Sequence, residues 1–186
     1  MKIAVIGAGP VGTSLGDKLQ AVGHEIKYGT RSPDSDKTAK TLSEHPGTTA
    51  AAVPDACTWA EAVVLAAPGS NDDEGIIALG KSLGDGVAGK LIIDATNPLS
   101  PFPAGLEVRW TQTKSGAEIL QEAVPTAKIV KAFNTIGQEH MVHPDGSEIT
   151  GVKLTMLFAC DPEVKDAAAQ IVSDAGWGEM VDGCTC

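Results

Sequence analysis

Three glycines near the N-terminus have the spacing of a phosphate-binding turn. Gly7, Gly9 and Gly12 follow an apolar, β-branched run over 2–6, and apolar residues at helical spacing continue to Val22. In such a strand–turn–helix unit the first glycine permits the tight turn, the second lets the backbone approach a diphosphate, and the third lets the helix pack closely on the sheet. The helix then offers unpaired N–H groups and the positive end of its dipole to the anion. The spacing therefore predicts a dinucleotide site.

The end of the second expected strand, 25–28, indicates which dinucleotide would bind. A site for NAD has Asp or Glu at this point, which accepts hydrogen bonds from the adenine ribose. Here the chain has Thr30, Arg31 and Ser32 instead. A guanidinium and two hydroxyl groups bind a 2′-phosphate, which a carboxylate would repel. Lys37, on the following short helix, adds positive charge, so this segment predicts NADP(H). The alternative is an arginine that only faces solvent in a polar loop.

The composition is typical of one ordinary globular domain over 1–186, with 42% hydrophobic and 20% charged residues. A net charge of −10 disfavours binding to nucleic acid or to anionic membranes. Strand residues begin at position 2 and no apolar run approaches membrane-spanning length, so we expect neither a signal peptide nor a membrane span. The four cysteines form no Cys-x-x-Cys pair, and we expect free thiols in a reducing cytoplasm.

Two close pairs of metal-binding side chains do not predict a metal site. His140 and His143 lack a convincing third ligand, and Cys184 and Cys186 supply only two ligands near the end of the chain. A zinc site in a protein needs three or four ligands from side chains. We therefore expect no bound metal.

Strand and helix patterns alternate along the chain. Expected strands cover 2–6, 25–28, 48–53, 62–67, 91–96, 128–133, 154–159 and 179–182. Between them, Ser115 and Glu118 form a capping box, and 161–163 is typical of an N-capped helix start. The polar segment over 137–151 could form a lid over the site. The alternation predicts an α/β fold of the Rossmann type, with a doubly wound, mostly parallel sheet in a single domain.

The expected crevice lies beyond the carboxyl ends of the strands, where the winding of such a sheet reverses. Residues at or directly after the ends of the first, second, fourth, fifth and sixth strands should therefore lie together. In chain order these residues are Gly7, Ala8, Gly9, Pro10, Val11, Gly12, Thr30, Arg31, Ser32, Ala67, Pro68, Thr96, Asn97, Asn134 and Thr135.

Five motifs, taken in order, resemble one known family. They are Gly7-Ala-Gly-Pro-Val-Gly12, Gly29-Thr-Arg-Ser32, Val64-Leu-Ala-Ala-Pro68, Asp94-Ala-Thr-Asn-Pro98 and Val130-Lys-Ala-Phe-Asn-Thr135. The chain resembles the NADP oxidoreductases that depend on coenzyme F420, an 8-hydroxy-5-deazaflavin. The likeness covers nearly the whole chain, and the last two motifs distinguish the family, since many dehydrogenases share the glycines. The same module resembles the NADPH-binding domain of the STEAP-type metalloreductases.

The resemblance implies where the cofactor contacts this chain. NADP would contact Ala8 to Val11, Thr30 to Ser32 and the region of Ala67. The nicotinamide would lie by Thr96–Asn97 and Phe133–Asn134, with the deazaflavin stacked on it. Hydride would pass directly from one ring to the other, so we expect no catalytic acid or base. The family also implies a homodimer.

Asn97 and Asn134 are the expected substrate-positioning residues. Their alternative role is to stabilise the turns at the strand ends. The leading prediction for the function is an NADPH-dependent reductase whose small-molecule acceptor is coenzyme F420, FMN or FAD. The alternative is a non-enzymatic NADPH-binding sensor. Imine and β-hydroxyacid reductases begin with similar domains but need a helical C-terminal domain, which the expected elements do not include.

Overall fold

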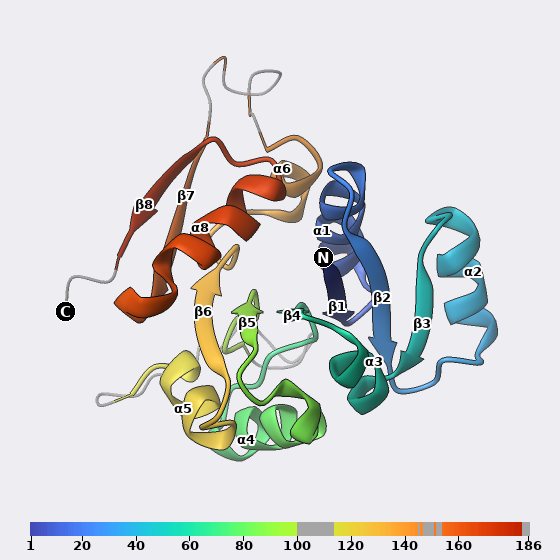
Figure 1. Cartoon of the computed structure of the whole chain (residues 1–186), viewed down its shortest axis with the longest axis horizontal. Helices are drawn as coiled ribbons and strands as arrows, with labels where there is room; N and C mark the ends of the chain where they lie inside the picture. The colour runs from blue at the N-terminus through green and yellow to red at the C-terminus, as the bar shows by residue number, and fades with distance from the viewer. Residues whose placement is uncertain (100–113, 145, 147–150, 152–153, 184–186) are drawn as a thin grey trace.

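One β-sheet runs through the chain (Figure 1). The computed structural model describes residues 1–99, 114–144, 146, 151 and 154–183. Within these ranges, eight strands form the sheet in the order β3-β2-β1-β4-β5-β6-β7-β8. The strands are β1 (Lys2–Ile6), β2 (Glu25–Thr30), β3 (Thr49–Ala52), β4 (Ala62–Leu65), β5 (Leu91–Asp94), β6 (Lys128–Ala132), β7 (Thr155–Cys160) and β8 (Glu179–Asp182). All neighbours are parallel except β6 and β7, so the predicted doubly wound, mostly parallel sheet is confirmed.

The central strand β1 is buried on both faces. Ile3 and Val5 belong to the hydrophobic cluster on one side of the sheet, and Ala4 and Ile6 to the cluster on the other side. Successive side chains of a strand point to opposite faces, so a strand covered on both sides needs apolar residues at every position. This requirement explains why the central strands have continuous apolar sequences.

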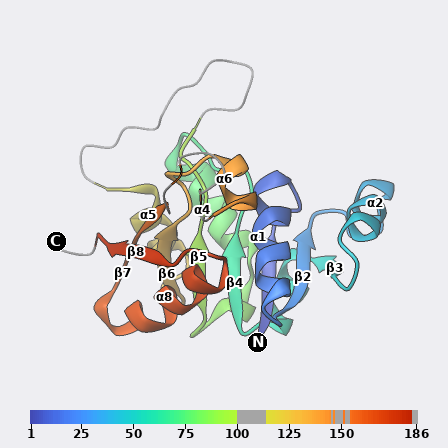
Figure 2. The ribbon, with the colours of Figure 1, turned by 90° about the horizontal axis from the view of Figure 1, so that it is seen from above.

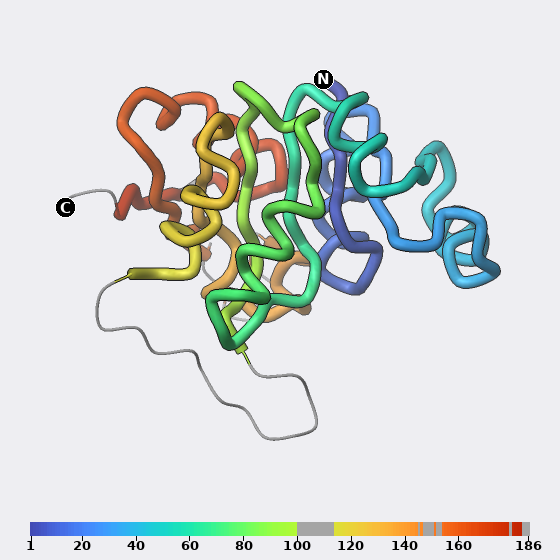
Figure 3. Tube along the Cα trace, turned by 90° about the horizontal axis from the view of Figure 1, so that it is seen from below, coloured from blue at the N-terminus to red at the C-terminus, as the bar shows by residue number. Residues whose placement is uncertain are grey.

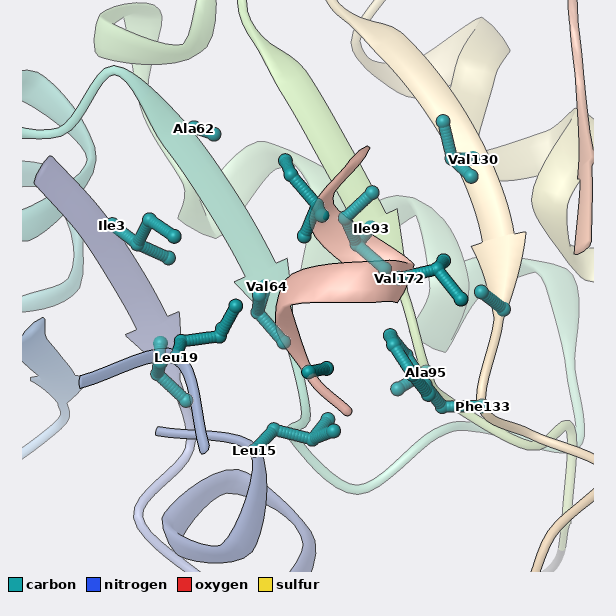
Figure 4. Packing of buried hydrophobic residues seen from close by; sticks show 14 of the residues in the cluster. Ile3, Leu15, Leu19, Ala62, Val64, Ile93, Ala95, Val130, Phe133 and Val172 are labelled. Atoms are coloured by element: carbon teal, nitrogen blue, oxygen red, sulfur yellow. The ribbon is translucent and has the colours of Figure 1, made fainter. Parts of the chain in front are cut away.

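Helices cover both faces of the sheet. They are α1 (Pro10–Ala21), α2 (Asp36–Glu44), α3 (Val53–Trp59), α4 (Asp73–Ser82), α5 (Gly116–Ala123), α6 (Gln138–Val142) and α8 (Lys165–Asp174), with short 3₁₀ turns η1 (Asp85–Val87) and η2 (Pro162–Val164). α1 packs against α6 and α8 on the first face, and α3, α4 and α5 cover the second (Figure 2). Figure 4 shows Val172 of α8 close to Ile93 of β5, in the cluster that also includes Leu15 and Leu19 of α1.

The winding of the sheet reverses between β1 and β4. From β1 the chain passes through α1 to β2 and then through α2 to β3. β3 is the strand at one end of the sheet, and α2 lies beside it (Figure 3). The chain then returns through α3 to β4 on the other side of β1. The exits of these strands are tied together, because Gly7 N–H donates to the Gly29 carbonyl at 3.1 Å and Ala66 N–H donates to the Ile6 carbonyl at 2.9 Å. The switch point therefore lies directly beside the glycine loop.

One predicted helix start is found in position but differs in form. Asp161 is the N-cap and Pro162 follows it, as the pattern predicts, but Pro162–Val164 forms a 3₁₀ turn ahead of α8 and the Asp161 side chain makes no capping hydrogen bond. α8 begins only at Lys165, since Val164 has φ −112° and ψ 5°, outside the helical range. The capping box of Ser115 and Glu118 is confirmed at the start of α5.

The segment over 137–151 is not only a polar loop. Its first part forms the short helix α6, which packs on α1 and buries Met141. Residues 145 and 147–150 of the expected lid lie outside the described residues, as does most of the expected loop over 99–113. In the described part of the chain, no helix has the length and apolar character needed to cross a membrane.

Candidate functional site

Two glycines of the N-terminal loop are required by close packing of the protein itself. Gly7 has φ +103°, and a Cβ atom there would lie 2.7 Å from the carbonyl oxygen of Ala66. A Cβ atom at Gly12 would lie 1.9 Å from the carbonyl oxygen of Gly7. Neither position can hold a side chain without moving backbone. These two residues shape the turn between β1 and α1.

Gly9 is different, because the protein does not require a glycine there. A Cβ atom at Gly9 would meet nothing within 4 Å, and its φ of −91° is open to any residue. The space in front of Gly9 is the position in which the predicted diphosphate would approach the backbone. Gly9 has open space before it and an ordinary backbone conformation. The glycine is therefore better explained by the approach of a phosphate group than by packing within the protein.

The N-terminus of α1 faces this space with free donors. Gly9 is the N-cap and has no side chain to cap the helix, and Pro10 occupies the first helical position. The amide groups of Val11 and Gly12 have no intrahelical acceptor, as in the first turn of any helix. No acidic residue lies in this first turn. Free N–H groups and the helix dipole thus combine as a site for an anion.

The loop after β2 is held in shape by its own hydrogen bonds. The Ser32 carbonyl accepts from Ser35 Oγ and Thr38 Oγ1, both at 2.9 Å. Arg31 and Lys37 are exposed, and among the described residues Arg31 forms no ion pair. A free guanidinium on a fixed loop suits a phosphate ligand.

Two further features of this loop are an unpartnered hydroxyl and nearby negative charge. The hydroxyl of Thr30 is buried and has no partner within the described part of the chain. Exposed carboxylates lie close in sequence to Arg31, at Asp34 and Asp36, which opens α2. The balance of charge around Arg31 is therefore mixed rather than purely positive.

The turns after β4, β5 and β6 contact one another. A Cβ atom at Gly69 would lie 1.9 Å from the carbonyl oxygen of Asn97, so the turn that follows Ala67 and Pro68 packs directly on the β5 exit. Asn97 Nδ2 donates to the Asn134 carbonyl at 3.2 Å, which joins the β5 and β6 exits. The two predicted positioning residues are thus brought together, and Asn97 also stabilises the turn, as its alternative role requires.

Phe133 combines a strained backbone with a buried side chain. Its φ is +65°, a left-handed conformation that is costly for a residue with a bulky side chain, and its side chain is 1% exposed. The ring belongs to the hydrophobic cluster on the α1 side of the sheet (Figure 4). Since the residue as a whole is 1% exposed, neither the ring nor the backbone of Phe133 is open to a ligand in this structure.

A buried ion pair at the same edge was not foreseen from the sequence. Asp94 Oδ2 lies 2.9 Å from Lys131 Nζ, and the side chain of Asp94 is 2% exposed. Asp94 Oδ1 accepts from Thr96 N–H at 2.9 Å and from Thr96 Oγ1 at 2.7 Å, and Lys131 also donates to the Thr96 carbonyl. The sequence offered one signal for this pair: Asp94 and Lys131 are charged residues within otherwise apolar strands. Because a buried charge is costly unless it is paired, such residues are expected to pair with each other.

A cavity of about 530 Å³ opens beside these turns, between α4, α5, β6 and β7. Of the predicted site residues, Thr96 and Asn134 line it; the glycine loop and Arg31 do not. Its walls are mostly apolar, with Ile76, Leu120 and Ile129 among the lining side chains. The volume is in the range of small-molecule sites.

The fold and the site define a dinucleotide-binding protein of the Rossmann class. Residues 2–98 match the family described as NADP oxidoreductase, coenzyme F420-dependent. The chain belongs to this family, as its motifs led us to expect.

Known structures and sequences agree with this assignment. The chain is 31% identical to a protein of Arthrobacter sp. FB24 described as an F420-dependent NADP-reductase, with a TM-score of 0.84 over 99% of this chain and 85% of that one. A hypothetical protein from Sinorhizobium meliloti is 25% identical, with a TM-score of 0.76 over 98% and 84% of the two chains. The metalloreductase STEAP3 of Rattus norvegicus is 26% identical over 135 residues, which are 73% of this chain and 25% of STEAP3. The chain thus spans about a quarter of that curated relative.

Proposed function

We propose that this member of the NADP oxidoreductase family transfers hydride between NADP(H) and a deazaflavin or flavin acceptor. One observation carries the proposal. Thr96 and Asn134 lie at the strand ends next to the predicted dinucleotide crevice, and both also line the 530 Å³ cavity. A ring system bound in the crevice and a second ring bound in the cavity would therefore meet at these two residues.

In this proposal the glycine loop binds the diphosphate. The first-turn amides of α1 donate to the phosphates, and Gly9 leaves room for their approach. At the far end, the exposed Arg31 guanidinium and Ser32 hydroxyl bind the 2′-phosphate, with Lys37 adding positive charge. The Thr30 hydroxyl is buried and would have to turn outward to join them. The loop geometry around Ser32 keeps these groups in place.

The nicotinamide, when bound, supplies or accepts the hydride. The chain aligns it through the turns of Ala67–Pro68, Thr96–Asn97 and Phe133–Asn134, which contact one another through Gly69 and Asn97. The contacts fix the distance between the β5 and β6 exits. Alignment and the exclusion of water are the main contributions that a protein makes to hydride transfer.

The name of one relative supports the acceptor class, because the Arthrobacter protein is described as F420-dependent. Coenzyme F420 is the first candidate, and FMN or FAD the second. No acid or base is required by a direct transfer between rings, and the charged groups at the cavity floor, Asp94 and Lys131, are already bonded to each other.

The test is anaerobic oxidation of NADPH by the purified chain, offered coenzyme F420, FMN and FAD in parallel, with NADH as the control donor. Turnover with F420 alone would support the F420 assignment, and turnover with FMN or FAD alone would support a flavin reductase. Tight NADPH binding without oxidation by any acceptor would contradict the proposal and favour an NADPH-binding sensor.

A further inference from the structure

We propose that Thr38 is a positioning residue for the choice of cofactor. Its buried hydroxyl holds the turn that presents Arg31 and Ser32, and the held turn creates the preference for NADPH over NADH. This role rests on the proposed function, because that function assigns Arg31 and Ser32 to the 2′-phosphate. Thr38 acts through the backbone of Ser32 and not by contact with the phosphate.

Three donors meet at the carbonyl of Ser32. Ser35 N–H donates to it at 3.2 Å, and Ser35 Oγ and Thr38 Oγ1 each donate to it at 2.9 Å. The two hydroxyl oxygens lie 3.1 Å apart, so each is closer to the carbonyl than to the other. Because each hydroxyl has one proton to donate, both protons can serve Ser32. The carbonyl is thus held from two positions further along the chain.

The hydroxyl of Thr38 serves this turn and not its own helix. Thr38 lies in the first turn of α2 and is 6% exposed, and Ser35 Oγ caps the helix by accepting from Thr38 N–H at 3.3 Å. A threonine inside a helix commonly bonds back to a carbonyl of the preceding turn. Thr41 does so, with Oγ1 3.1 Å from the Lys37 carbonyl. Thr38 instead reaches past the start of the helix to Ser32.

Arg31 lies between two anchored carbonyls. Before it, the Gly29 carbonyl accepts from Gly7 N–H at 3.1 Å, which ties the end of β2 to the glycine loop. After it, the Ser32 carbonyl is held by Thr38. In NADPH the diphosphate and the 2′-phosphate are attached to one ribose, so the distance between them varies little. A backbone that already holds the two sites at a matching distance binds both groups without reordering.

Nearby carboxylates make a fixed turn more important. Asp34 and Asp36 are exposed and close in sequence to Arg31. On a loose turn the guanidinium would be free to pair with either carboxylate, and a phosphate would have to compete with that pair. In the part of the chain that the structure describes, Arg31 forms no ion pair. The held turn therefore keeps the cation available to the 2′-phosphate.

Thr38→Val tests this role, because valine has nearly the shape of threonine but no hydroxyl group. NADPH and NADH differ only by the 2′-phosphate, and titration of protein fluorescence with each cofactor measures both affinities. We expect Thr38→Val to bind NADPH about five-fold more weakly, the effect of one neutral hydrogen bond, with NADH binding changed less than about two-fold. Thr38→Ser keeps the hydroxyl and should restore NADPH affinity to within about two-fold of the wild type.

The variants are chosen to leave α2 intact. In Thr38→Val, Ser35 still caps the helix, and its N–H and hydroxyl still donate to the Ser32 carbonyl. Thr38→Ala removes the same hydroxyl with a residue that favours helices, so it should weaken NADPH binding in the same direction even if valine packs poorly. The control is Thr41→Val, which removes a hydroxyl bonded within α2 and should leave both affinities unchanged. Thermal unfolding followed by circular dichroism checks that each variant is folded.

Several results would overturn the positioning role of Thr38. These are unchanged NADPH affinity in the valine and alanine variants, an equal loss for NADPH and NADH, no recovery in Thr38→Ser, or the same loss in Thr41→Val. A wild type that binds both cofactors equally would contradict the 2′-phosphate assignment and this role with it. NADPH oxidation is a separate readout of the proposed function. A chain in which Thr38 controls the preference but no acceptor is reduced would retain the positioning role and contradict the proposed reaction.

Discussion

Lys131 and Asp94 form an ion pair between neighbouring strands, with Nζ and Oδ2 2.9 Å apart. The two residues are direct partners in the parallel register of β5 and β6. Asp94 also accepts two hydrogen bonds from Thr96, and Lys131 donates to the Thr96 carbonyl. The pair therefore fixes the exit turn of β5 against β6. Since this turn leads into Asn97, the pair positions the residues proposed to align the two rings.

Removal of one partner should destabilise the fold strongly. Lys131→Met leaves the Asp94 carboxylate buried without its cation, and breaking a buried pair in this way costs about 3 kcal/mol. The measurement is urea unfolding at neutral pH. The double variant Asp94→Asn/Lys131→Met removes both charges and should recover part of the loss. If the double variant loses as much free energy of unfolding as Lys131→Met and Asp94→Asn lose together, the two charges do not interact.

The fold was largely predictable because its signals are local. Apolar β-branched runs, such as Ala62–Leu65, alternate with helical patterns, and Gly7–Gly12 identifies the first crossover. The local signal at Asp161 correctly located a helical N-cap, but it did not reveal that the first turn, up to Val164, is a 3₁₀ turn. The Asp94–Lys131 pair needs the adjacency of β5 and β6, and no spacing along the chain reveals that adjacency directly.

Among the predicted site residues, too, some roles depend on local geometry and others on contacts between distant parts of the chain. The need for glycine at Gly12 follows from its close approach to Gly7 within the same loop, which the glycine spacing already encodes, whereas Gly7 also packs on Ala66 at the distant β4 exit. The burial of the Phe133 ring depends on α1 and α8, which pack beneath the β6 exit from distant parts of the chain. The cavity wall at Glu118 and Asp161 combines α5 with the turn after β7, and the sequence alone did not bring these residues together.

Acid should weaken the contribution of Glu118 to stability. Hydrogen bonds from Ser115 hold the pKa of Glu118 below its ordinary value of 4.5. A carboxyl group with a lowered pKa in the folded state stabilises the protein above its unfolded pKa, and this stabilisation is lost as the pH falls through the folded pKa. The difference in Tm between the wild type and Glu118→Gln should therefore shrink below about pH 4.5. A constant difference from pH 7 to pH 3 would contradict this linkage.

Arg31 should discriminate between the two nicotinamide cofactors. Arg31→Ala removes a hydrogen-bonding cation from the proposed 2′-phosphate site, and a hydrogen bond to a charged group contributes about 1.5–3 kcal/mol. We therefore expect NADPH to bind about ten- to a hundred-fold more weakly, with NADH almost unaffected. Titration of protein fluorescence with each cofactor measures both affinities, and Lys81→Ala, in the last turn of α4, is the control. An equal loss for NADPH and NADH would exclude the 2′-phosphate assignment.

Gly9 and Gly12 should respond in opposite ways to the same substitution. Gly12→Ala would place a Cβ atom 1.9 Å from the Gly7 carbonyl oxygen, so thermal unfolding should show a large loss of stability, of about 3 kcal/mol or more. Gly9→Ala meets nothing within 4 Å, so Tm should stay the same or rise slightly. Its methyl group would instead enter the space proposed for the diphosphate and weaken NADPH binding at least ten-fold. Unchanged NADPH affinity in a stable Gly9→Ala protein would show that the diphosphate does not approach the backbone at this glycine.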